Sequence, residues 1–144
     1  MFQGLLKRLG LTPKITPPPS SALATTVASP IIDVTDSTFA KVVLAADKLV
    51  IVDFWAEWCQ PCQIMSAYVT FLAKDFGDQI KLAAMDVDEN PLTSPQYDIM
   101  GLPTLLFFYG GEVMDRVVGI EPYAEIQRRV AAWLAKDGIN KAAN

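Results

Sequence analysis

Residues 50–62 read Val-Ile-Val-Asp-Phe-Trp-Ala-Glu-Trp-Cys-Gln-Pro-Cys and contain the only two cysteines of the chain. The run from 49 to 55 is β-branched and aromatic apart from Asp53, a pattern that predicts a strand buried on both faces. Pro61 then stands where the first turn of a helix would fall, and proline is tolerated there because the N–H that it lacks would have no partner. This stretch therefore predicts a strand that leads directly into a helix, with the cysteines at the junction.

The segment after the second cysteine repeats with a helical period. Apolar residues recur at i, i+4, i+7 and i+8, at Ile64, Tyr68, Phe71 and Leu72. Gly77 marks the end of the pattern. We expect a helix that packs this face against the sheet.

Two cysteines separated by two residues at the start of a helix predict redox chemistry. The unpaired N–H groups and the positive dipole end of the helix favour a thiolate at Cys59, which is the candidate nucleophile. Cys62 lies about one turn further along, close enough to form a disulfide with Cys59. Two alternatives are a structural disulfide and half of a zinc site completed by dimerisation. A disulfide that closes so short a loop constrains the unfolded chain little, and the chain has no histidine, the commonest metal ligand.

The remaining elements follow in an alternating order that predicts an α/β fold with a mixed sheet covered on both faces. A helix with Thr35 or Asp36 as N-cap is expected to turn Phe39, Val42 and Val43 inward. Gly110 and Gly111 separate two β-rich runs and predict a hairpin. The expected strands are 31–34, 49–55, 80–87, 105–109 and 112–118, and the expected helices are 37–46, one after Cys59, 94–99 and a final one through 126–134.

The chain resembles the thioredoxin family over roughly residues 31 to 136. The resemblance is carried by Asp53-Phe54-Trp55-Ala56-Glu57-Trp58-Cys59 followed by Gln60-Pro61-Cys62, by Asp88-x-Asn90-Pro91, by Tyr97-x-Ile99-x-Gly101-x-Pro103-Thr104 and by Val118-Gly119. It implies the thioredoxin fold, a three-layer α/β/α arrangement with a mixed central β-sheet. It also implies a monomeric protein-disulfide reductase with no metal and no cofactor besides the Cys59–Cys62 disulfide, whose partners are protein disulfides and a thioredoxin-reductase-type electron donor.

The resemblance also assigns site residues. Asp53, a buried acid in the family, is expected to exchange protons with Cys62; the alternative is an acid at a strand end that reaches solvent. Pro103 is expected to follow a cis peptide bond. The positions that match the family's substrate groove are Trp58, Gln60, Pro61, Gly101, Leu102, Pro103, Val118 and Gly119.

Three positions depart from the family pattern. Gln60 replaces the usual glycine between the cysteines, and Ala84 stands where a buried lysine commonly faces the buried acid. Without that cation Asp53 is expected to ionise less readily. Ala67 replaces a helix proline, so we expect a less kinked helix. These departures predict a redox potential and a partner set different from those of a housekeeping thioredoxin.

The charge distribution argues against nucleic acid as a partner. The chain carries twelve basic and sixteen acidic residues, for a net charge of −4. Three of the basic residues precede Asp33, so residues 33–144 carry nine basic and sixteen acidic groups. A body of this charge repels phosphate backbones.

Residues 1–30 are expected to form an N-terminal extension to a domain at 31–144. In residues 1–11, leucines and Phe2 lie on one helical stripe and predict docking on a membrane surface or a protein; a frayed tail is the alternative. Residues 12–30 hold five of the ten prolines and no acid, which predicts a stiff tether. The tail motivates a second hypothesis, a tethered binding module with secondary redox chemistry. No signal-peptide pattern is present, so we expect a cytoplasmic protein, peripheral to a membrane at most, rather than one with an organelle transit peptide.

Overall fold

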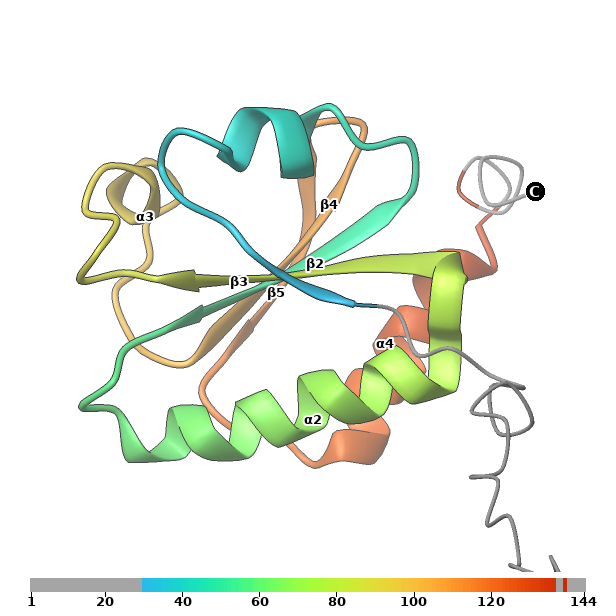
Figure 1. The fold of residues 1–144 in the computed structure, drawn as a ribbon. Coiled ribbons are helices and arrows are strands. Elements are labelled where there is room, and N and C mark those ends of the chain that lie inside the picture. Colours follow the sequence, from blue (N-terminus) through green and yellow to red (C-terminus); the bar gives the residue numbers. More distant parts are fainter. Residues whose placement is uncertain (1–29, 137–138, 140–144) are drawn as a thin grey trace, which may run out of the picture.

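The computed structural model describes residues 30–136 and residue 139, and these contain one five-stranded sheet (Figure 1). The expected amphipathic start at 1–11 lies outside the described residues, as does all of the expected tether except Pro30. Within the sheet the strands follow the order β1-β3-β2-β4-β5, so β2 is central. The strands are β1 (Ile31–Asp33), β2 (Leu49–Trp55), β3 (Ile80–Asp86), β4 (Thr104–Tyr109) and β5 (Glu112–Val118).

The sheet is mixed, as the sequence predicted. β3 pairs in parallel with both β1 and β2, whereas β4 is antiparallel to β2 and to β5. Gly110 and Gly111 both have positive φ, of 61° and 82°, and form the expected hairpin turn between β4 and β5.

Helical segments lie on both sides of this sheet and give the three-layer α/β/α arrangement with a mixed central sheet that the resemblance implied. In Figure 1, α2 and α4 lie together on one side of the sheet, and η2 and α3 lie on the other. The helical elements are η2 (Ala40–Leu44), α2 (Gln60–Phe76), η3 (Gly77–Gln79), α3 (Thr93–Gln96) and α4 (Tyr123–Leu134). Within the described part of the chain, none of these helices is both long and apolar enough to cross a bilayer.

Strand β2 contributes to both cores because its side chains alternate between the two faces. Leu49 and Ile51 belong to the core beneath α2 and α4, while Val50 and Val52 belong to the core on the opposite face. By the same alternation Asp53 lies on the α2 face. A carboxylate is thereby placed under the helix that carries the cysteines.

The expected buried face of α2 was wrong for two of its four residues. Ile64 is 48% exposed and Phe71 is 43% exposed, while the buried residues of the helix are Cys62, Met65, Val69, Leu72 and Ala73. The apolar stripe of α2 is therefore broader than the face of the helix that is buried. Phe71 lies at the margin of that face, where its ring packs edge-on against Tyr123 of α4. The helix α2 is continuous from Gln60 to Phe76, and Gly77 caps its end as expected.

Two of the expected helices are shorter in the structure. The helix expected over 37–46 is the π-helix η2, in which Ala45 N donates to Ala40 O. Phe39 and Val43 are buried as expected, whereas Val42 is only partly buried against the same core. Of the two expected caps, Thr35 accepts a hydrogen bond from Thr38 N on its Oγ1 at 3.3 Å, whereas Asp36 accepts none from this segment. Instead its carboxylate accepts hydrogen bonds from the backbone N–H groups of Leu92 and Thr93. This long-range contact ties the start of η2 to the start of α3, which spans Thr93–Gln96 rather than 94–99.

The observed orientation of α2 predicts the outcome of two alanine substitutions on this one helix. Leu72→Ala, at a fully buried position, is expected to lower the free energy of unfolding by about 2–5 kcal/mol. Ile64→Ala removes a half-exposed side chain and is expected to cost about 1 kcal/mol or less. Urea unfolding of the oxidised protein measures both, and equal costs would contradict the orientation of the helix.

Candidate active site

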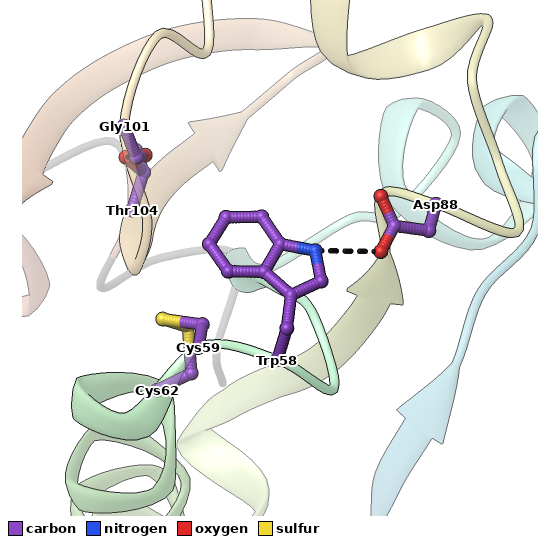
Figure 2. The surroundings of a disulfide bond; sticks show 6 residues. All are labelled: Trp58, Cys59, Cys62, Asp88, Gly101 and Thr104. Carbon is purple, nitrogen blue, oxygen red and sulfur yellow. Dashed lines mark hydrogen bonds between the residues drawn. A yellow bond between two sulfur atoms is a disulfide. The ribbon is translucent and has the colours of Figure 1, made fainter.

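The two cysteines lie where β2 passes into α2, and they form a disulfide (Figure 2). Cys59 is the N-cap residue of α2, with extended backbone angles, and its N–H donates to Ala56 O at 3.2 Å. Cys62 lies in the first turn of α2, and the two Cα atoms are 5.4 Å apart. Cys59 therefore lies at the positive end of a 17-residue helix.

Gln60 and Pro61 separate the cysteines on the outer surface of the first turn. Both residues are exposed, and Pro61 falls within the first two helical positions, as the sequence predicted. The cysteines themselves are only 5% and 4% exposed. Gln60 and Pro61 are therefore part of the exposed surface beside the buried cysteines.

Trp58 forms the most exposed aromatic surface beside the disulfide. Its side chain is 71% exposed, and the indole Nε1 donates a hydrogen bond of 2.8 Å to Asp88 Oδ2 (Figure 2). Asp88 follows β3 and was not among the site residues expected from the sequence. Its position in the Asp88-x-Asn90-Pro91 motif was a signal that it matters, but nothing in the motif shows that it faces Trp58.

The loop before β4 supplies the next part of the site. The Leu102–Pro103 peptide bond is cis, as the resemblance implied. Pro103 O accepts a 2.8 Å hydrogen bond from Gly119 N, which holds the loop beside the end of β5. Val118 is paired with Thr104 and is 60% exposed. Two segments that are distant in sequence are thus joined at one edge of the site.

This loop also reaches the disulfide. Leu102 packs against the small buried cluster formed by Ala56, Cys59 and Cys62. Thr104 Oγ1 donates a 2.7 Å hydrogen bond to Gly101 O, and Figure 2 shows both residues on the chain segment above the disulfide. The structure thereby gathers around the cysteines residues from the β2–α2 junction and the loop before β4.

Asp53 lies beneath this surface and is almost fully buried. It is 3% exposed, and its Oδ1 is buried without a hydrogen-bond partner among the described residues. Burial raises the pKa of Asp53 from its ordinary value of 3.8 to about 7. The alternative of an acid that reaches solvent at a strand end is therefore wrong. Its register partner on β3 is Ala84, so no cation comes from that position.

A cavity of about 490 Å³ connects the buried acid with the disulfide. Asp53, Cys59 and Cys62 all line it, together with Ser66 of α2 and Ala84 of β3. Asp53 and the two cysteines thus border one space. The sequence did not predict this cavity.

Metal chemistry finds no support in the described residues. Among residues 30–136 and 139, no three His, Cys, Asp or Glu side chains are placed to hold a metal ion. Because the two cysteines form an intrachain disulfide, they are not half of a shared zinc site in this structure. The redox group is the Cys59–Cys62 pair itself.

Comparison with known proteins agrees with the family resemblance seen in the sequence. The family model described as Thioredoxin matches residues 30–132. Thioredoxin 1 from Nostoc sp. is 45% identical over 101 residues, which covers 70% of this chain and 94% of that protein. Thioredoxin from Buchnera aphidicola is 44% identical over 89 residues, 62% of this chain and 82% of that protein. Thioredoxin M-type, chloroplastic, from Pisum sativum is 38% identical over 101 residues, 70% of this chain and 59% of that protein.

The raised pKa of Asp53 predicts an unusual pH dependence of stability. Since the folded pKa of about 7 lies above the unfolded value near 3.8, the folded state binds more protons than the unfolded state between these values. The stabilisation from protonated Asp53 is complete below pH 3.8 and is lost as the pH rises through 7. For the oxidised protein we expect a loss of about 2 kcal/mol between about pH 5.5 and about pH 8.

Asp53→Asn is the matched variant for this prediction, because the amide does not titrate. Its free energy of unfolding, measured in urea, is expected to stay nearly constant over the same pH range. The chain has no histidine, so no side chain of the type that normally titrates there obscures the comparison. Parallel pH profiles for the wild type and Asp53→Asn would contradict the raised pKa.

Proposed function

Because this chain belongs to the thioredoxin family and is a thiol–disulfide oxidoreductase, we propose that it acts as a protein-disulfide reductase. In this proposal Cys59 is the attacking residue and Cys62 the resolving residue. The observation that carries it is the redox pair at the N-terminus of α2, with a buried carboxyl group of raised pKa in the same cavity.

The first step is attack by Cys59 in the reduced protein. The Cys59 thiolate attacks one sulfur of the substrate disulfide, the substrate S–S bond breaks, and the released substrate thiolate takes a proton. The N-terminus of α2 stabilises the negative charge on Cys59 before attack, because its backbone N–H groups and dipole are directed there. The product of this step is a mixed disulfide between Cys59 and the substrate.

The second step is resolution by Cys62. The Cys62 thiol transfers its proton toward the Asp53 carboxylate, and its sulfur attacks Cys59, which releases the second substrate thiolate. Asp53 suits this role because a carboxyl group with a pKa of about 7 both accepts and returns a proton near neutral pH. Two electrons pass to the substrate, and the Cys59–Cys62 disulfide is formed.

The substrate is proposed to bind along the surface between Trp58 and the loop before β4. Trp58 and Val118 offer exposed apolar side chains, and Leu102 lies against the cysteine cluster. The family resemblance implies that the backbone before Pro103 pairs with an extended peptide. Gln60, Pro61, Gly101 and Gly119 complete the proposed contact set.

The electron donor is proposed to be a thioredoxin-reductase-type protein, and the compartment to be the reducing cytoplasm. A donor is required because each turnover leaves Cys59 and Cys62 oxidised. A reducing compartment supports this direction of electron flow, since it keeps the pair available as a dithiol.

Two serine substitutions test the division of roles between the cysteines. Turnover in an insulin-reduction assay with dithiothreitol as donor is expected for the wild type and is expected to vanish in Cys59→Ser. Cys62→Ser is expected to accumulate a mixed disulfide with the substrate, because the resolving thiol is missing. Mass spectrometry under non-reducing conditions detects this adduct. An adduct formed by Cys59→Ser but not by Cys62→Ser would reverse the assignment, and an inactive wild type would refute the proposed function.

A further inference from the structure

A row of three side chains crosses the sheet beneath α2. In the register of the parallel strands, Ala84 of β3 is paired with Asp33 of β1 on one side and with Asp53 of β2 on the other. Neighbouring strands lie about 4.8 Å apart, so the Cα atoms of Asp33 and Asp53 are separated by roughly two strand spacings. Ala84 holds the register position between them, and all three residues line the cavity of about 490 Å³, Asp53 as a buried residue and Asp33 as an exposed one on the edge strand.

The cavity is lined by acidic side chains, and one of them, Asp53, has a buried oxygen without a partner among the described residues. Its lining includes a third carboxyl group, that of Glu57, and no lysine or arginine. Oδ1 of Asp53 is buried and accepts no hydrogen bond from the described residues. Leaving a buried carboxylate oxygen without a partner is costly. A ligand that is positively charged and carries N–H donors would remove that cost.

The lining favours an organic cation over a metal ion. Within residues 30–136 and 139, no three His, Cys, Asp or Glu side chains are placed to hold a metal. The cavity also has apolar walls from Ile31, Trp55 and Ala56, against which a hydrocarbon chain can pack. An alkylammonium group combines such a chain with three N–H donors, so one group meets both requirements.

We propose that this cavity binds an alkylammonium group, with the ammonium between Asp53 and Asp33 and the alkyl chain against Ile31 and Trp55. This chemistry is carried both by the lysine side chain of a docked protein and by free aliphatic diamines. Binding does not require thiol exchange, because the acids and the apolar walls are present in the oxidised protein. The site therefore stands or fails independently of the proposed reductase activity.

An NMR titration of the full-length, oxidised, ¹⁵N-labelled protein tests the proposal. The two probes are butane-1,4-diamine and Nα-acetyl-lysine N-methylamide, each added at pH 8, above the Asp53 pKa of about 7. At least one probe is expected to give saturable shifts of the Asp33, Ala84 and Ser66 amides. Saturation by the diamine alone identifies a free amine as the ligand, and saturation by the lysine derivative alone identifies a protein side chain. Failure of both probes overturns the proposal.

Three variants make the test specific. Asp53→Asn keeps the size of the side chain but removes its charge, and is expected to weaken binding by roughly tenfold or more. Asp47→Asn removes an exposed acid that does not line the cavity, and is expected to leave the affinity within about twofold. Ala84→Lys is expected to abolish binding because its own ammonium group fills the space. Equal affinities for Asp53→Asn and Asp47→Asn would overturn the site even if the probes bind.

Discussion

The burial of one carboxyl group behind the redox disulfide is the constraint on which the site depends. Asp53 occupies the central strand, on the face covered by α2, and its burial follows from the same alternation that places Leu49 and Ile51 in the core. Its side chain is only 3% exposed, and β3 presents only Ala84 at its side. The energetic consequence is a group that favours its protonated form up to neutral pH.

The junction of β2 and α2 places the buried carboxyl group of Asp53 and the two cysteines around one cavity. The strand ends two residues beyond Asp53, and the helix begins after Cys59, so the acid and both cysteines are fixed by one continuous rigid segment. The partner surface comes from elsewhere in the chain, because the loop with cis Pro103 is held to β5 through Gly119. The reactive residues are thus close together in the sequence, whereas the proposed surface for partners is brought together only by the tertiary structure. Rigid placement of both is what disulfide exchange requires.

Local patterns predicted the elements well where one rule dominated. The strands at 49–55 and 112–118 have the expected bounds, because alternating or continuous apolar runs end at clear turn signals. The face of α2 was harder to predict, since Ile64 and Phe71 fit a helical stripe equally well but lie outside the area that the sheet covers. The π-helical form of η2 depends on contacts that sequence periodicity does not contain. The bond from Trp58 to Asp88 and the row Asp33–Ala84–Asp53 depend on strand order, which a linear pattern does not specify.

The central claim is that Asp53 is a buried acid that titrates near neutrality, and its carboxyl ¹³C resonance reports this directly. The titration uses the oxidised protein in a buffer free of amines, with Asp53→Asn to assign the signal. A midpoint near pH 7 is expected. A midpoint close to the ordinary value of 3.8 would show that the carboxyl group is solvated or paired, and would contradict both the proton-transfer role and the unpartnered site.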